Sequence, residues 1–176
     1  TSVNGPGVTR TTFAPVPPPR VLLAATALTF AAMTFLLGEM LSFTAFGIGQ
    51  AILGPEHLGA SLRDTDVLRA VIGGGVYLTL VGLLGMALGA LFRRTASGLA
   101  TLFALLFLAM LIASTLPASW YDRIGQYLPA SAGSQIMFVI PLDQHVFGPW
   151  SGVGVLALYV TAVFGSAAYL VGRRDA

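Results

Sequence analysis

Long apolar stretches alternate with short polar ones along this chain. The clearest apolar stretch lies between Arg69 and Arg93, where residues 70–92 carry no charge. As a helix it would be about 34 Å long, enough to cross a hydrocarbon core of about 30 Å. The pattern therefore predicts a transmembrane helix over residues 70–92, and the Arg93–Arg94 pair that follows is typical of a cytoplasmic end.

Three further stretches have the length and polarity of a membrane span. Residues 21–53 contain Glu39 as their only charge, and they would form about 50 Å of helix. That length exceeds one upright crossing, so this helix is expected to tilt, to kink near Gly38 or to protrude. Residues 96–116 and 150–171 complete the set. The predicted fold is an all-α, polytopic transmembrane helix bundle with four spans.

Residues 117–149, between the third and fourth spans, mix polar residues with short apolar runs. None of these runs is long enough to cross a membrane, and Trp120 and Tyr127 are suited to the membrane–water interface. We expect short helices here that lie in the external leaflet or dip into it, as an interfacial or re-entrant segment. Residues 1–20, rich in proline, are expected to be a cytoplasmic N-terminal segment before a transmembrane domain over 21–176, either a coupling-like segment or a flexible tail without a partner.

Glycines fill the interior of the predicted helix over 70–92. Gly85 and Gly89 form a G-x-x-x-G pair, and Gly82 precedes them by one turn. Such spacing allows another helix to approach the backbone closely. Two interpretations stay open: close packing within the bundle, or a dedicated dimer face.

Composition and charge placement agree with a membrane protein. The chain has 176 residues, of which 56% are hydrophobic and 9% charged, whereas about 25% are charged in soluble domains. The arginines divide unequally between the two sides of the predicted bundle. Arg10, Arg20, Arg93, Arg94, Arg173 and Arg174 fall on one side, and Arg63, Arg69 and Arg123 on the other. This asymmetry predicts a multi-pass protein of the cell membrane with both termini in the cytoplasm.

The residues for several kinds of chemistry are missing. The sequence contains neither cysteine nor lysine, which excludes thiolate chemistry, Schiff bases and a P-loop for ATP hydrolysis in this chain. An intramembrane enzyme could be assembled only from Glu39, His57, Asp143 and His145, without an H-E-x-x-H motif or paired carboxylates in the spans. The sequence therefore predicts neither an enzymatic activity nor a resident metal or cofactor.

Glu39 is the one candidate site residue inside a predicted span. A carboxylate at membrane depth is a functional candidate by default, and it should face protein or a water-filled cavity. The functional interpretation places it on a substrate path. The structural alternative is a side chain that faces the bundle or extends to the membrane surface.

Three stretches resemble permease subunits of actinobacterial ABC transporters of the type-2, export-associated class. Residues 68–98 resemble the fourth helix of that family, residues 149–176 resemble its last helix with the Arg-Arg-Asp ending, and residues 116–136 are similar to the external segment before that helix. The family usually has six helices. The resemblance, which runs from about residue 7 onward, therefore covers its C-terminal two thirds and implies two helices upstream.

The resemblance also implies a contact with an ATPase. Residues 7–20 look like the cytoplasmic stretch between the family's second and third helices, which lies near the ATPase subunit. The positions that match are Gly7, Arg10, Thr11, Thr12 and Arg20, whereas Val3 and Asn4 stand where the family tends to carry an acidic residue and a tyrosine.

By this resemblance the chain is expected to be a permease subunit, or the C-terminal part of one, in an ATP-driven exporter. Its partners would be a separate ATPase, which binds ATP and Mg, and a second permease copy or homologous permease; no nucleic acid is expected. The alternative is a non-transporting accessory or truncated membrane subunit within a larger membrane complex.

Overall fold

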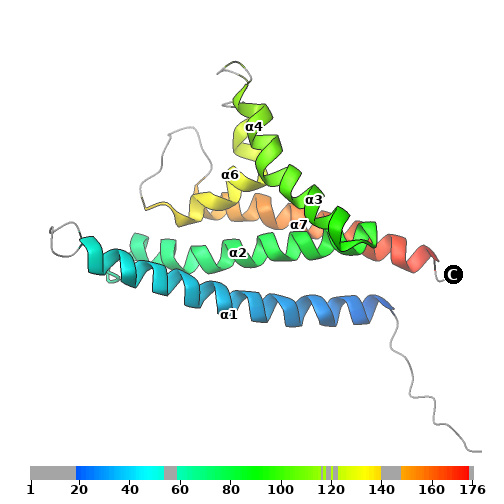
Figure 1. Ribbon diagram of the computed structural model, residues 1–176, viewed down its shortest axis with the longest axis horizontal. Coiled ribbons are helices and arrows are strands. Elements are labelled where there is room, and N and C mark those ends of the chain that lie inside the picture. Colours follow the sequence, from blue (N-terminus) through cyan, green and yellow to red (C-terminus); the bar gives the residue numbers. More distant parts are fainter. Residues whose placement is uncertain are drawn as a thin grey trace, which may run out of the picture.

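The computed structural model describes residues 19–53, 59–115, 117, 120, 123–139 and 148–174. Its helices in chain order are α1 (Pro19–Leu53), α2 (Thr65–Phe92), α3 (Thr95–Phe103), η2 (Ala104–Leu108), α4 (Ala109–Ser114), η3 (Gly125–Tyr127), α6 (Pro129–Ser134), η4 (Gln135–Met137) and α7 (Pro149–Arg174). The segments α3, η2 and α4 follow one another without a break and form one span (Figure 1). The described residues contain no strand.

Four helices are long and apolar enough to cross a membrane. They are Val21–Leu53, Thr65–Phe92, Thr95–Ser114 and Pro149–Leu170. The predicted all-α polytopic bundle with four spans is therefore confirmed, and α1 passes through Gly38 as one continuous α-helix. The bounds differ slightly from those predicted: α2 begins at Thr65, because its polar first turn carries Asp66, which suits the positive end of the helix dipole.

Proline begins three of the helices. Pro19, Pro129 and Pro149 are the first residues of α1, α6 and α7. A first-turn residue has no partner for its backbone N–H within the helix, so proline loses nothing there, and its fixed φ angle already suits the helix. Proline thus marks where these three helices start.

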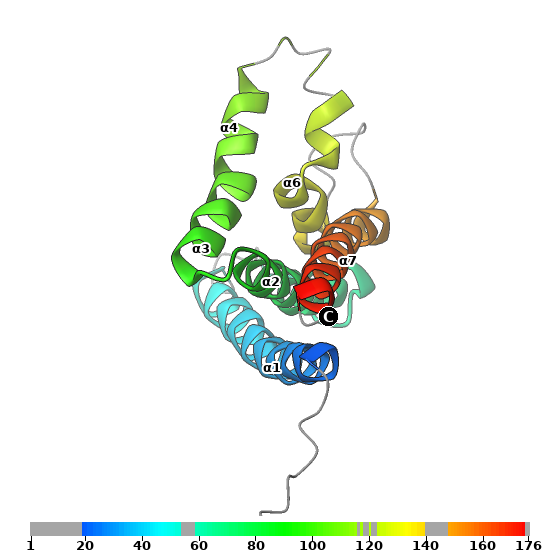
Figure 2. The ribbon, with the colours of Figure 1, turned by 90° about the vertical axis from the view of Figure 1, so that its right-hand side faces the viewer.

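Helix α2 is the centre of the bundle. It packs against α1, α3 and α7, and it runs beside α1 and α7 over much of its length (Figure 1). The tightest apolar cluster joins α2 to α7 through Leu84, Leu88, Leu156 and Val160. Seen end-on, the span α3–α4 turns away from the other helices, and α6 lies on the side of α2 and α7 that faces it (Figure 2).

Most of α1 is not covered by the rest of the chain. Leu28 is 73% exposed and Ile52 69% exposed, and both belong to a long series of apolar side chains that point away from α2. In water such a surface would drive aggregation, whereas in a bilayer it contacts lipid tails or another membrane protein. The described part of the chain is thus a multi-pass membrane protein.

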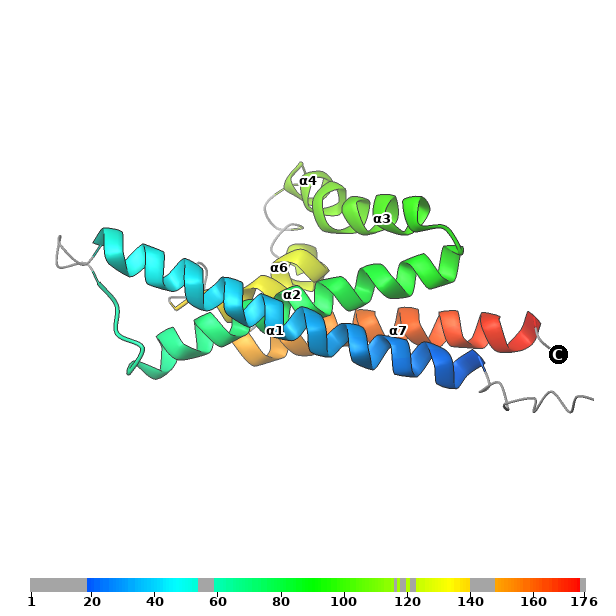
Figure 3. The ribbon, with the colours of Figure 1, turned by 60° about the horizontal axis from the view of Figure 1, so that its bottom comes forward.

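The ends of the helices fall into two groups. The start of α1, the turn between α2 and α3 and the end of α7 lie at one end of the bundle, called here the Arg93 end (Figure 3). The end of α1 and the starts of α2 and α7 lie at the other, called the Arg69 end. The third span is the exception, because α4 runs away from the other helices and its end belongs to neither group (Figures 1 and 2).

The third span contains a π-helical turn that the sequence did not predict. Residues Ala104–Leu108 adopt i→i+5 geometry between two α-helical pieces. Its apolar residues give no periodicity that would distinguish a π-turn from an α-helix, because every face of this span is apolar.

Candidate functional site

The two backbones of α1 and α2 come unusually close at Gly38 and Gly75. A Cβ atom placed on Gly38 would lie 3.1 Å from Cα and 3.2 Å from the carbonyl oxygen of Gly75. Only glycine allows this approach without displacing a helix. The closeness brings the next residue of α1, Glu39, directly onto the surface of α2.

Glu39 fills the space that a side chain at position 75 would take. A Cβ on Gly75 would lie 2.6 Å from the carboxyl carbon of Glu39 and would also overlap its Oε1. Both carboxylate oxygens are buried, and neither has a hydrogen-bond partner among the described residues. The Glu39 carboxylate thus lies at the α1–α2 interface, in contact with the backbone of α2, although the residue as a whole is partly exposed.

Ser42 occupies the same face of α1 one turn further along. Its hydroxyl donates a hydrogen bond to the carbonyl oxygen of Val71 at 2.5 Å, across the α1–α2 interface. A Cβ on Gly74 would lie 2.7 Å from the Ser42 hydroxyl oxygen. We call the region formed by Gly38, Glu39 and Ser42 of α1 and by Val71, Gly74 and Gly75 of α2 the seam.

Other hydroxyl groups of the spans bind within their own helix. Thr34 donates to the carbonyl oxygen of Phe30, Thr79 to that of Gly75 and Thr161 to that of Ala157. This is the usual way for a hydroxyl to be satisfied in lipid. The contrast distinguishes Ser42, and it also shows that the Gly75 carbonyl next to Glu39 already accepts a hydrogen bond.

A cavity of about 260 Å³ adjoins the seam on the side of the Arg69 end. Its walls come from α1, from the loop before α2, from α2 and from the end of η4 with the residues after it, and Ser42 is the one polar residue among them. The lining residues are Ser42, Phe46, Ala60, Val67, Ala70, Val71, Met137 and Val139. Ser42 and Val71 belong both to this cavity and to the seam, so the two adjoin. We call it the seam cavity.

Arg69 fastens the segment after η4 to the start of α2. Its guanidinium contacts the Asp66 carboxylate at 2.8 Å and donates to the carbonyl oxygen of Phe138 at 3.1 Å. Phe138 lies between two residues that line the seam cavity, so this hydrogen bond holds one wall of the cavity in place.

We expect Arg69→Ala to loosen this wall. Loss of the hydrogen bond to the Phe138 carbonyl should lower the local opening free energy by about 1–2 kcal/mol, because a charged donor is removed. Amide hydrogen exchange of residues 135–139 should become roughly tenfold faster. Arg63→Ala, at an exposed loop arginine, is the control. Equal protection of residues 135–139 in both variants would contradict the assigned role of Arg69.

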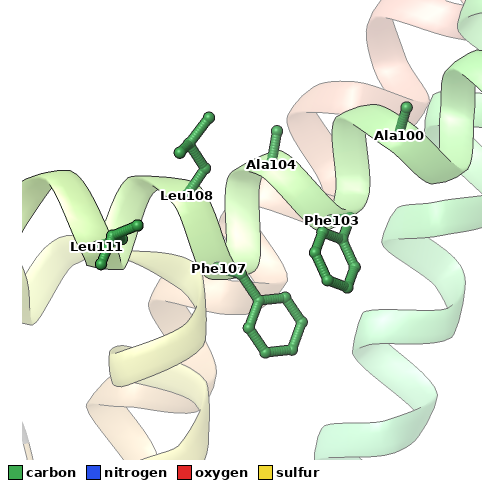
Figure 4. Close-up of a pocket in the computed structure, with 6 residues that line it drawn as sticks. All are labelled: Ala100, Phe103, Ala104, Phe107, Leu108 and Leu111. Atoms are coloured by element: carbon green, nitrogen blue, oxygen red, sulfur yellow. The ribbon is translucent and has the colours of Figure 1, made fainter.

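A larger groove of about 500 Å³ runs along the third span. It is lined by Ala100, Phe103, Ala104, Phe107, Leu108 and Leu111 (Figure 4). The rings of Phe103 and Phe107 stack with their centres 4.5 Å apart. The groove offers no charge and no hydrogen-bonding side chain, so it is not the candidate site.

The predicted packing glycines contact helices of the same chain. A Cβ on Gly82 would lie 3.2 Å from the ring of Phe30 in α1, and one on Gly85 would lie 2.9 Å from Leu102 in the third span. Gly89 is approached by Gly98 of α3, whose Cβ would lie 2.7 Å from the Gly89 Cα. The described contacts of the G-x-x-x-G pair are thus with the third span.

Several predicted positions fall outside the described residues. These are Arg10, Thr11, Thr12, His57, Asp143 and His145. Arg20 lies in the first turn of α1. Among the described residues no group of three or more histidines, cysteines, aspartates or glutamates could hold a metal ion.

The sequence analysis missed the partners of Glu39. The run Gly73–Gly74–Gly75 contained the signal, because three adjacent glycines leave every side of one helical turn free of side chains. In the structure Gly73 meets Ile136, Gly74 meets Ser42 and Gly75 meets Glu39. Three different side chains therefore contact one turn of α2.

Together the fold and the seam define a multi-pass α-helical membrane protein with a buried carboxylate between two spans. Comparisons with family models, with curated proteins and with solved structures find no match to this chain.

Proposed function

We propose that the chain is the membrane-spanning permease subunit, or the C-terminal part of one, of an ATP-driven ABC exporter. A separate ATPase subunit, which binds ATP and Mg, would power it, and a second permease copy or homologous permease would complete the path. The observation that carries this proposal is the segment of short helices between the third and fourth spans, residues 125–137. It corresponds to the external segment that precedes the last helix in the permeases that the sequence resembles.

This segment is built into the bundle. Ala132 is fully buried and Ile136 is 1% exposed. A Cβ on Gly133 would lie 2.6 Å from Leu156 of α7 and 2.9 Å from Tyr77 of α2. Short helices packed this closely against two spans favour a role in the wall of a translocation path over a role as a loosely attached surface segment. The proposal makes the Arg69 end external.

The Arg93 end would then be cytoplasmic, where an ATPase must act. The start of α1, which includes Arg20, lies at this end (Figure 3). Arg10 and Arg20 are the charges best placed in the sequence to meet an acidic partner surface, since charge complementarity speeds and orients such contacts. Arg10 lies outside the described residues, so this assignment rests on the sequence.

We expect the double variant Arg10→Ala, Arg20→Ala to weaken the ATPase contact. Two charge pairs at the rim of an interface would lower ATPase recovery roughly tenfold. The measurement is the amount of ABC ATPase that co-purifies with the tagged chain from its native membrane, together with ATP hydrolysis in the recovered complex.

The matched control is Arg173→Ala, Arg174→Ala, which removes two arginines from the same end of the bundle. It should leave the recovery of ATPase unchanged while both variants insert into the membrane normally. Equal ATPase recovery with the two double variants would refute the coupling assignment.

A non-transporting accessory subunit is the second candidate. The exposed apolar surface of α1 favours it, because that surface would suit a place within a larger membrane complex. For this function the same purification should yield a defined membrane complex without any ABC ATPase.

A further inference from the structure

We infer that the seam binds the cationic amine group of an amphipathic substrate at Glu39, with the apolar part of that substrate in the seam cavity. The inference rests on the proposed transport function and names the class of substrate. Four features of the described residues carry it: an unpartnered carboxylate, the lack of a cation near it, an adjoining apolar cavity and a single hydroxyl group between the carboxylate and that cavity.

The carboxylate of Glu39 needs a partner that the described residues do not supply. Burying a charged or polar group without hydrogen bonds is costly, and in a membrane-spanning helix such a group is retained for a purpose. Glu39 is the only charged residue of the α1 span, and α2 has no charge between Arg69 and Arg93. Tyr77, the only tyrosine of α2, packs against Gly133 on another side of that helix.

Arg69 is not that partner. It lies about 9 Å along the helix axis from Gly75, and its guanidinium is already engaged by Asp66 and by the Phe138 carbonyl. The remaining position for a positive charge is next to the carboxylate itself, inside the seam.

The seam cavity provides the rest of the site. Ser42 follows Glu39 by nearly one turn of α1, and Val71 precedes Gly75 by about one turn of α2, so the cavity ends about 5 Å of helix rise from the carboxylate. Its volume of about 260 Å³ lies just below the roughly 300–1,000 Å³ of drug-sized pockets. An open apolar pocket next to one carboxylate favours a small molecule with an apolar body and a cationic group, and it disfavours anions.

Ser42 separates the carboxylate from the cavity. Its hydroxyl is held by the Val71 carbonyl, and no side chain of α2 lies beneath it because that position is Gly74. Rotation of this one small side chain, with a slight separation of α1 from the glycines, would open the passage. Gly74 and Gly75 therefore allow access to the site as well as close packing of the two helices.

The test is equilibrium binding to the full chain purified in a non-ionic detergent. The probe is benzyltrimethylammonium, whose charge does not change with pH, and its uncharged counterpart is neopentylbenzene. We expect saturable binding of the cation, much weaker binding of the neutral compound, and at least a tenfold loss of cation affinity in Glu39→Gln. Asp64→Asn, which removes an exposed carboxylate at the start of α2, should bind as the parent does.

A second variant keeps the test decisive if Glu39→Gln fails to fold. Ala70→Phe leaves the carboxylate in place but fills the seam cavity, and it should lower the cation affinity by a similar factor. Three results would overturn the inference: no saturable binding by the parent chain, as expected if Glu39 holds only a proton; equal affinity for both probes; or unchanged affinity in both variants. Because no ATPase takes part, failure here leaves the proposed permease function standing, and failed ATPase recovery leaves the cation site standing.

Discussion

Replacing Gly152 by valine should separate α6 from α7 and destabilise the protein by about 3 kcal/mol, since a clash against backbone cannot be relieved by a rotamer change. Gly152 is buried in α7 against α6. A Cβ there would overlap the carbonyl oxygen of Ala132 and would lie 3.1 Å from its carbonyl carbon. That carbonyl belongs to a helix that α2 and α7 both cover, so relief requires the whole of α6 to move.

Gly154→Val is the matched control, because it makes the same substitution in the same helix two residues later. A Cβ on Gly154 would meet nothing within 4 Å. The two variants therefore share the change in helix propensity and differ only in the contact. Unfolding in mixed micelles with increasing dodecyl sulfate should give a clearly lower midpoint for Gly152→Val alone. Equal midpoints would show that α6 does not rest against α7 as described.

Gly98→Ala should have the second-largest effect, a loss of about 2 kcal/mol from overpacking. Gly98 is buried at the crossing of α3 and α2. A Cβ at this position would lie 2.7 Å from both Cα and the backbone nitrogen of Gly89 and 3.2 Å from the carbonyl carbon of Leu88. All three are backbone atoms of α2, so the third span would have to move away from it.

The same substitution on the other residue of this contact, Gly89→Ala, is the control. A Cβ on Gly89 would point into open space, with nothing within 4 Å. Because alanine favours a helix over glycine by up to about 1 kcal/mol, this variant should be as stable as the parent or slightly more stable. If Gly89 instead served as a dimer face, Gly89→Ala would shift the protein to monomers in cross-linking experiments, and Gly98→Ala would be the milder change.

The spans could be predicted from the sequence because a bilayer allows few backbone conformations. Every backbone group inside the bilayer must find a partner within its own helix, so apolar length alone indicates where helices run. The sequence did not predict the exact ends of the helices or the π-helical turn in the third span. The first turn of α2 contains the polar residues Thr65 and Asp66, and Asp66 pairs with Arg69, so apolar length alone did not indicate where this helix begins.

The candidate site could be predicted only in part. Glu39 stood out as a single charge in an apolar span, but its environment depends on which turn of α2 it meets. That pairing follows from the close approach of Gly38 to Gly75, two residues far apart in sequence. The same holds for Gly98, whose contact with Gly89 depends on the crossing of two spans. Patterns along one helix do not encode where another helix crosses it.

The π-helical turn at Ala104–Leu108 gives the third span one more residue than a regular helix of the same path would need. One extra residue rotates everything beyond it by about 100° around the helix axis. The piece next to Arg94 and the piece that ends at Ser114 therefore present different sequence faces to the same surroundings. In consequence, the third span has no single lipid-facing stripe, and the two pieces are free to adapt separately to different neighbours, one to α2 and the other to whatever lies beside α4.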